Sequence, residues 1–202
     1  MNRAIRLRTD PEEVRAAILE VAEEHFRRLG YQKTSVADIA AVLKMSPANV
    51  YRFFPSKAAI VGAICARVTG EIQALGLAIA RSEGTVAERL ERYLVEIHRH
   101  NRATLMNDQR LHDMVGVAME ENWEAIEAHI AAMRAIVTDL IREGIASGEF
   151  AEDDADLLGH VVKSSFVMFL HPRMIEQCCD VDVEPVARKL VQVLVNGLKK
   201  RD

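Results

Sequence analysis

The sequence predicts an all-α protein with a small N-terminal domain over residues 1–55 and a larger helical bundle over residues 56–202. Three observations lead to this prediction. Apolar residues recur at helical spacing, only five prolines and ten glycines interrupt 202 residues, and strand-like alternation never extends beyond four residues. Half of the residues are apolar and 28% are charged, a balance typical of folded domains rather than disordered chains.

The first helix is predicted over residues 11–29. Asp10 suits its N-cap, Pro11 suits the first helical position, and Glu13 lies where the acid of a capping box belongs. Apolar residues then recur every three or four positions as far as Gly30, and glycine often follows the last turn of a helix.

Two short helices joined by a tight turn are predicted next. Ser35 followed three residues later by Asp38 forms a capping box, which predicts a helix start. Ser46 can cap the following helix and Pro47 can open it, so this helix is predicted over residues 48–53.

The rest of the chain is predicted to form further helices. Their expected ranges are residues 56–81, 86–103, 106–118, 122–146, 153–170 and 183–200. Thr85 and Glu88 form another capping box, and Gly148 marks the end of the helix over residues 122–146. His171-Pro172 should kink or split the segment that carries it, because proline cannot donate the backbone hydrogen bond of an inner helical position.

Charge is distributed unevenly along the chain. The formal net charge is −4, which excludes a histone-like protein that binds nucleic acid by bulk charge. Residues 1–60 nevertheless hold ten Lys and Arg against seven acids, a net of +3, and the remainder holds 16 against 23, a net of −7. This asymmetry predicts a basic working end on an acidic body.

Residues 34–53 meet the requirements of a helix-turn-helix. Such a pair needs a small residue where the helices cross, and Ala40 supplies it. The apolar residues that can lock the pair are Ile39, Leu43, Met45 and Val50. The second helix must present small and polar side chains to a major groove about 12 Å wide. The residues suited to that task are Ser46, Pro47, Ala48, Asn49 and Arg52.

Three stretches of this region carry a family resemblance: TSVADIA (residues 34–40), MSPANVYRFF (residues 45–54) and SKAAI (residues 56–60). Together they resemble the N-terminal DNA-binding domain of the TetR family of transcriptional regulators, over about residues 14–64. The remaining two-thirds resemble the family only in length, helicity and placement. The resemblance implies a homodimer with a C-terminal ligand-binding and dimerisation domain.

The resemblance also implies roles for single residues. Thr34 is implied to bond a DNA phosphate, and Tyr51 and Lys57 match family positions that contact phosphates. The implied opening of the recognition helix, which faces the groove, consists of Ser46, Pro47, Ala48 and Asn49.

Two residues depart from the family pattern. Lys44 stands at a turn position that is often glycine, so the turn must tolerate a side chain, and a positive φ is one way to do so. Phe53 stands where the family often has Tyr or His, and its ring cannot hydrogen-bond a phosphate.

The N-terminal stretch with Arg3, Arg6 and Arg8 has two interpretations. It is either an arm that reaches phosphates or a narrow minor groove, or a frayed and solvated tail.

The predicted bundle also suggests a binding cavity. Methionine adapts to irregular packing, and a ligand pocket is expected to be mostly apolar with a few polar anchors. The candidate lining residues are His98, Met106, His112, Met114, Trp123, Phe166, Phe169 and His171. The other interpretation is an ordinary core, because methionine and aromatic stripes at helical spacing usually pack inside a bundle.

Dimerisation is predicted on the last two long helices. Each has a continuous apolar face, and two such faces exceed what one small bundle can bury, so a two-fold four-helix interface is expected. The residues assigned to this interface are Leu158, Val162, Phe166, Leu190 and Leu194.

The sequence supplies no catalytic or metal-binding pattern, so we expect no enzyme activity, cofactor or metal. It lacks P-loop and dinucleotide-binding glycine patterns, and Ser147 is one position late for a nucleophile elbow. Asp108 and His112 are four residues apart, but two ligands do not make a metal site. Three cysteines favour a reducing compartment, and the adjacent Cys178 and Cys179 pair poorly, which leaves redox sensing open. With no run near the roughly 20 apolar residues of a membrane span, we expect a cytoplasmic protein without a membrane partner.

These observations predict a ligand-responsive regulator, most simply a repressor that binds a palindromic DNA operator as a homodimer and is released by a small, largely apolar effector. The helix over residues 56–81 joins the two domains, and its glycines at 62, 70 and 76 permit either a pivot or close packing. The alternative is a dimeric DNA-binding regulator with no small-molecule inducer, controlled by a protein partner. An enzyme with an appended DNA module would need a catalytic set, and a vestigial helix-turn-helix would not need the polar outer face.

Overall fold

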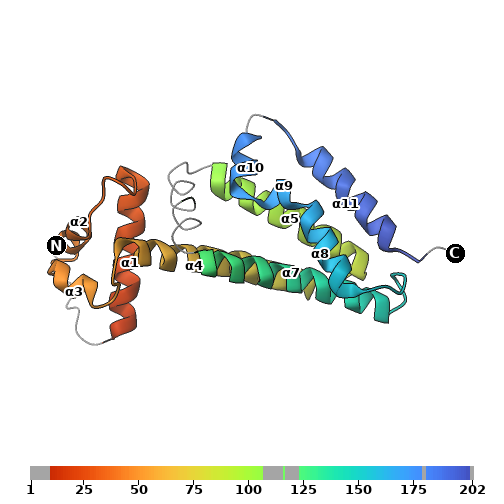
Figure 1. Cartoon of the computed structure of the whole chain (residues 1–202), viewed down its shortest axis with the longest axis horizontal. Helices are drawn as coiled ribbons and strands as arrows, with labels where there is room; N and C mark the ends of the chain where they lie inside the picture. The colour runs from red at the N-terminus through yellow and green to blue at the C-terminus, as the bar shows by residue number, and fades with distance from the viewer. Residues whose placement is uncertain (1–9, 107–115, 117–122, 179–180, 201–202) are drawn as a thin grey trace. The chain divides into compact units, whose positions relative to one another are not determined.

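The computed structural model describes residues 10–106, 116, 123–178 and 181–200. The helices are α1 (Pro11–Leu29), α2 (Val36–Val42), α3 (Pro47–Tyr51), α4 (Lys57–Ala80), α5 (Val86–Met106), α7 (Trp123–Ala146), α8 (Ala155–Ser165), α9 (Val167–Leu170), α10 (Pro172–Gln177) and α11 (Glu184–Leu198) (Figure 1). The only β-type pairing in this described part is an isolated bridge between Phe150 and Lys199. The all-α prediction is confirmed. The helix predicted over residues 106–118 lies almost wholly outside the described residues.

The described chain forms two compact units, which we call the N-terminal unit (to Arg67, with Gly116 and Trp123) and the C-terminal unit (the other described residues from Val68 onward). The predicted domain boundary, after residue 55, precedes α4, whereas this division falls within α4. Each unit has its own hydrophobic core. The core of the N-terminal unit is formed by Ile18, Ala22, Phe26, Val36, Ile39, Ala40, Val50, Phe54, Ile60, Val61, Ile64 and Cys65.

The first helix begins and ends as its sequence predicts. The Asp10 side chain accepts a hydrogen bond from the Glu12 amide at 2.9 Å, and Pro11 occupies the first position. Gly30 has a φ of 92°, which a residue with a side chain rarely adopts, and its amide donates to Phe26 O at 2.9 Å. Glu13 was expected to complete a capping box, but the cap of α1 consists of the Asp10 side chain alone.

Helix α4 contributes to both cores, which explains its unusual composition. Ile60 and Ile64 are buried in the N-terminal core, and Ile72 and Ile79 are buried in the C-terminal core. Helix α4 has 24 residues, and an 18-residue window within it has a mean hydropathy of 1.3, so it is long and apolar enough to cross a membrane by length and composition alone. The expectation that no segment reaches this size was therefore wrong. Burial in the two cores involves part of this apolar pattern, because 28% of the apolar window of α4 is buried.

The C-terminal unit contains the helices from α5 onward. Its core is formed mainly by Leu90, Tyr93, Leu94, Ile97, Met133, Val137, Leu140, Ile141, Phe150, Val162, Phe166, Phe169, Val191 and Val195. The start of α5 has the predicted capping box, since the Glu88 amide donates to Thr85 Oγ1 at 3.2 Å and the Thr85 amide donates to Glu88 Oε2 at 2.9 Å. The Glu149 carboxylate also accepts from the amides of Val86 and Ala87, at 2.9 and 2.8 Å. This second cap ties the turn after α7 to the start of α5.

The segment predicted as one helix over residues 153–170 is divided at Phe166. Helix α8 ends at Ser165, whose hydroxyl donates back to Val161 O at 2.8 Å, a bond that competes with regular helix geometry. Helix α9 follows and ends at Leu170, and His171 separates it from α10, which confirms the expected split before Pro172. The break at Phe166 lets its ring lie in the core, where it is fully buried.

Candidate nucleic-acid interface

Helix α2 is held at its start by the complete capping box that the sequence predicts. The Asp38 amide donates to Ser35 Oγ at 3.2 Å, and the Ser35 amide donates to Asp38 Oδ2 at 2.8 Å. The Ser35 hydroxyl donates to the same carboxylate at 2.6 Å. These hydrogen bonds from Ser35 lower the pKa of Asp38, so the carboxylate stays charged and the box stays closed at neutral pH.

The turn between α2 and α3 has the hydrogen bonds of a Schellman motif, with lysine in the left-handed position. Lys44 has a φ of 55°, and its amide donates to Ala41 O at 3.1 Å. The Met45 amide donates to Ala40 O at 2.9 Å, which satisfies a second carbonyl at the end of α2. The positive φ that the sequence raised for Lys44 is confirmed. This turn sets the direction in which α3 leaves α2.

Helix α3 presents small and polar residues to solvent and buries one apolar side chain. Ser46 caps it by accepting from the Asn49 amide at 3.2 Å, and Pro47 occupies its first position. Val50 is fully buried against the N-terminal core. The exposed residues are Ser46, Pro47, Ala48, Tyr51 and Arg52, and Asn49 is half-buried. The structure therefore gathers all six of these sequence-predicted residues at one exposed segment.

Arg15 on α1, which sequence reasoning missed, supports the end of α3. Its Nη1 donates to Phe53 O at 3.0 Å, and the centre of its guanidinium lies 4.4 Å from the centroid of the Phe54 ring. The partners are 38 positions apart in the chain, so no local pattern announces this contact. Phe53 is half-buried, in agreement with a packing role rather than a polar contact.

Thr34 and Lys57, which the family resemblance assigns to phosphates, make their contacts inside the N-terminal unit. Thr34 is 1% exposed, and its hydroxyl donates to Gly30 O at 3.0 Å. Lys57 donates from Nζ to Tyr31 O at 2.9 Å and to Thr34 O at 3.0 Å, and Nζ lies 4.0 Å from the centroid of the Tyr31 ring. These bonds join the α1–α2 connection to the first turn of α4. The geometry supports a positioning role for both residues, which the sequence did not predict.

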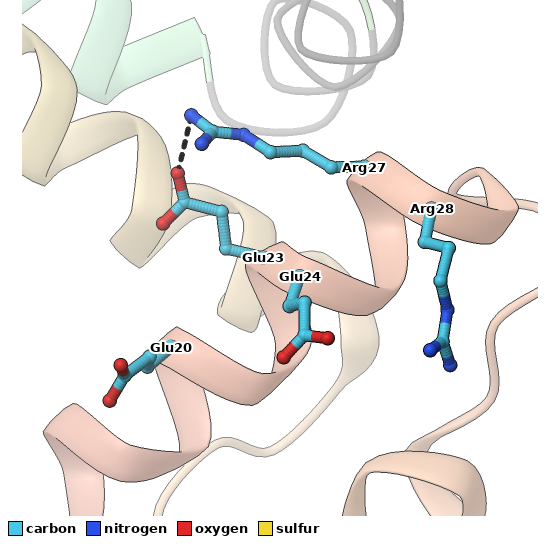
Figure 2. Close-up of a pocket in the computed structure, with 5 residues that line it drawn as sticks. All are labelled: Glu20, Glu23, Glu24, Arg27 and Arg28. Atoms are coloured by element: carbon cyan, nitrogen blue, oxygen red, sulfur yellow. Dashed lines mark ion pairs between the residues drawn. The ribbon is translucent and has the colours of Figure 1, made fainter.

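A charged hollow lies on the surface of α1. It is lined by Glu20, Glu23, Glu24, Arg27 and Arg28 (Figure 2). Glu23 is largely buried and pairs with Arg27 at 2.7 Å, and its other carboxylate oxygen bonds Arg67 of α4. These ion pairs hold α1 to α4 within the N-terminal unit. A lining of carboxylates and guanidinium groups does not match the apolar pocket predicted for an effector.

Three of the residues predicted to line an effector pocket meet in the C-terminal core. His98 Nδ1 lies 2.8 Å from Phe169 O, and the two rings are 5.6 Å apart at 84°. Phe166 packs on Phe169 with ring centroids 4.8 Å apart. His98 Nε2 is buried with no hydrogen-bond partner among the described residues. His171 lies partly buried at the α9–α10 junction.

The other four predicted pocket residues cannot be placed relative to His98, Phe166, Phe169 and His171. Met106 ends α5 and Trp123 begins α7, but their side chains lie outside the described residues, as do His112 and Met114 altogether.

Most of the residues predicted to form the dimer interface pack against the core of the C-terminal unit instead. Val162 and Phe166 are 1% and 0% exposed, so in this structure they are unavailable to a second chain. Leu158, Leu190 and Leu194 are half-buried against the same core. The apolar residues that α8 and α11 leave exposed are Leu157, Val161, Val186 and Val193. They lie on the same two helices, and on α11 they flank the half-buried Leu190.

Neither metal nor redox chemistry gains support from the described residues. Within those residues, no group of three or more His, Cys, Asp or Glu side chains could hold a metal ion. Burial raises the pKa of the Cys65 thiol to about 11, so this thiol is unreactive at neutral pH. Cys178 is half-buried, and Cys179 and the Asp108–His112 pair lie outside the described residues, as do Arg3, Arg6 and Arg8.

Two family profiles match the chain. Residues 18–64 match the bacterial regulatory proteins of the tetR family, and residues 86–191 match the tetracyclin repressor-like C-terminal domain. The curated proteins contain no match to this chain.

Many solved structures share the fold. A TetR/AcrR family regulator from Thermobifida fusca is 26% identical, with a TM-score of 0.63 over 93% of this chain and 100% of its own. The FadR repressor of Thermus thermophilus, solved with lauroyl-CoA, is 17% identical, with a TM-score of 0.66 over 93% of this chain and 96% of its own. FadR of Bacillus subtilis, solved with stearoyl-CoA, is 21% identical, with a TM-score of 0.65 over 91% and 98%.

Proposed function

Because the chain belongs to the TetR family of DNA-binding transcription regulators, we propose that it is a ligand-responsive repressor. In this proposal a homodimer binds a palindromic operator, and a small, largely apolar effector releases it. The observation that carries the proposal is the exposed surface of α3, which is small and polar at its start and rigidly capped by Ser46.

The α3 surface has the features that base reading requires. We assign Ser46, Pro47, Ala48 and Asn49 to the major groove, because the first residues of a recognition helix approach base edges. Tyr51 is 49% exposed, and with the exposed Arg52 it is positioned one turn further along to contact phosphates. Thr34 and Lys57 act behind this surface by holding the connections around α2 in place.

The homodimer is proposed on the exposed apolar residues of α8 and α11. Leu157 and Val161 are one turn apart on α8, and Val186 and Val193 are two turns apart on α11, so each helix presents a stripe to solvent. A two-fold interface made from both stripes would remove these side chains from water. Two copies of α3 must then lie about 34–36 Å apart to enter successive major grooves on one face of DNA.

An apolar effector is proposed to act through the C-terminal unit. The FadR proteins solved with lauroyl-CoA and stearoyl-CoA share this fold, which supports an acyl-chain compound as one effector class to test. If the effector favours a dimer geometry that fits DNA poorly, it must weaken DNA binding by the same factor by which DNA weakens effector binding. Helix α4 is suited to couple effector binding to DNA binding, because it contributes buried residues to the cores of both units. A regulator of this kind would work in the cytoplasm.

Selection of bound sequences from random duplex DNA tests the proposal. The expected product is an inverted repeat with half-site centres about one helical turn, or a multiple of it, apart. Asn49→Ala should change base preference within the half-site, and Tyr51→Ala should weaken binding of all sequences about equally. Arg81→Ala, an exposed change in the C-terminal unit, is the control. Failure to enrich any sequence at modest ionic strength would refute the proposed DNA-binding function.

A further inference from the structure

Lys163 is a lysine on the inner side of α8. It lies one turn after Gly159 and one turn before Phe166, both of which are buried, and its own side chain is half-buried. None of the described residues forms an ion pair with its ammonium group. Burial lowers the pKa of Lys163 to about 8, and no neighbouring carboxylate offsets this effect. The C-terminal unit thus holds a partly desolvated cation without a counterion.

His129 brings a second polar group to the same place. It lies on the buried stripe of α7, one turn after Ile126 and one turn before Met133, which are both buried. Its Nδ1 is buried and has no hydrogen-bond partner in the described part of the chain. Burial and the charge of Lys163 lower the pKa of His129 to about 4, so the ring is neutral at physiological pH. A neutral imidazole can donate one hydrogen bond to an acceptor.

The two helices that carry these residues, α7 and α8, pack against each other. Thr138 of α7 fits against Gly159 of α8 so closely that a Cβ at residue 159 would lie 3.0 Å from the Thr138 Cβ. Arg134 Nη1 and His160 Nδ1 are 3.3 Å apart along the same contact. Lys163 follows on α8, where its charge acts on His129.

We propose that Lys163 and His129 bind the anionic head group, a carboxylate or a phosphate, of an amphipathic effector. The lysine supplies the missing counter-charge and the histidine supplies a hydrogen-bond donor. An apolar core does not require a lysine at this position, because partial burial of a charge without a partner is destabilising. This inference rests on the proposed function and names the chemical class of its effector.

Binding of defined probes to the ligand-free, full-length protein tests the head-group site. The probes are dodecanoate, dodecanoyl-CoA, dodecanol and CoA alone, and the measurement is isothermal titration calorimetry supported by thermal unfolding. We expect wild type to bind at least one of the two anionic amphiphiles tenfold or more tightly than dodecanol. Tighter binding of dodecanoate identifies a carboxylate head group, whereas tighter binding of dodecanoyl-CoA, with CoA alone weak, identifies a phosphate.

Substitutions then separate the head group from the tail. Lys163→Met should lose tenfold or more affinity for the preferred anion and keep the affinity for dodecanol, while Lys163→Arg should retain most of the anion binding. Lys199→Met, which removes an exposed lysine, is the matched control. Because Lys163→Met removes an unpaired charge, it should fold at least as stably as wild type, which thermal unfolding verifies.

Two results would overturn the head-group site: anion affinity of Lys163→Met equal to that of wild type, or no preference of wild type for either anion over dodecanol. Operator binding without any probe should be the same in Lys163→Met and wild type. Lost anion binding in wild type with intact operator binding would refute only this inference, whereas lost operator binding would refute the proposed function.

Discussion

Two lysines show how single residues shape the N-terminal unit. Lys44 has a positive φ, which is unfavourable for a residue with a side chain. The ammonium group of Lys57 donates to two backbone carbonyls and lies over an aromatic ring. Neither lysine is explained by charge alone, although both lie in the basic part of the chain. Their effects are local, and stability measurements on single variants can separate them.

Lys44→Gly should stabilise the protein. A residue with a side chain costs about 1–2 kcal/mol in the left-handed region, so replacing it by glycine removes this cost. Glycine also makes the unfolded chain more flexible, which offsets part of the stabilisation. We expect an increase of about 0.5–1 kcal/mol in the free energy of unfolding, measured by urea denaturation. Lys33→Gly, in the exposed α1–α2 connection with a negative φ, should give no such gain. Equal effects of the two changes would show that Lys44 is unstrained.

Lys57→Met should destabilise the N-terminal unit by about 2 kcal/mol, because hydrogen bonds from a charged group to partly buried carbonyls are lost. Lys57→Arg should not restore stability, since a planar guanidinium cannot replace a compact ammonium between two carbonyls. Lys33→Met is the control for removal of an exposed lysine. Urea denaturation gives the stability, and operator binding is measured in parallel. Unchanged stability with weakened DNA binding would instead support the phosphate contact that the family resemblance implies.

At the scale of elements, glycines mark where helices approach each other most closely. On α4, a Cβ at Gly76 would lie 2.9 Å from Tyr93 Cε2, whereas a Cβ at Gly70 would meet no atom within 4 Å. Close packing is therefore the role of Gly76, while Gly70 lies in open space on the same helix. On α8, Gly159 permits the contact with Thr138 on α7.

Gly159→Ala and Gly70→Ala should therefore change stability in opposite directions. The added methyl at residue 159 overlaps the Thr138 side chain and approaches its Cα at 3.1 Å, so we expect a loss of about 1–3 kcal/mol. At residue 70 the methyl meets nothing, and the higher helix propensity of alanine should add about 0.5–1 kcal/mol. Thermal and urea denaturation measure both changes. A neutral Gly159→Ala would show that α7 and α8 are free to separate.

At the scale of the whole molecule, the apolar residues that a single chain leaves exposed indicate where a second chain could bind. Leu157 and Val186 are 58% and 57% exposed, on two helices whose inner faces already fill the C-terminal core. Helices that are apolar on two faces bury one in their own fold and leave the other for a partner.

Leu157→Asp combined with Val186→Asp should convert the proposed dimer into a folded monomer. Each carboxylate would be solvated in the monomer but desolvated in the interface, so association is lost while thermal unfolding stays cooperative. Sedimentation at micromolar concentration measures the mass, and operator affinity should fall by tenfold or more because one half-site is lost. Val181→Asp, an equally exposed change outside both helices, is the control. A double variant that remains dimeric would place the interface elsewhere.

The sequence by itself determined most of the helix limits and the exposed surface that we propose to read DNA. The caps at Asp10, Ser35 and Ser46, the glycine at residue 30 and the proline after His171 all act within a turn or two, so their effects can be predicted without knowing the fold. The capped start of α3 follows from such local signals.

Only the tertiary structure decided which face of each apolar helix lies inside and which polar groups turn inward. Leu157 and Val162 are both apolar and point about 140° apart on α8, and hydropathy alone cannot tell which one the core takes. The inward contacts of Thr34 and Lys57, and the cap that Glu149 places on α5, likewise join residues distant in the chain. Such contacts depend on where whole helices pack, and that is set by the sum of many buried side chains rather than by any local pattern.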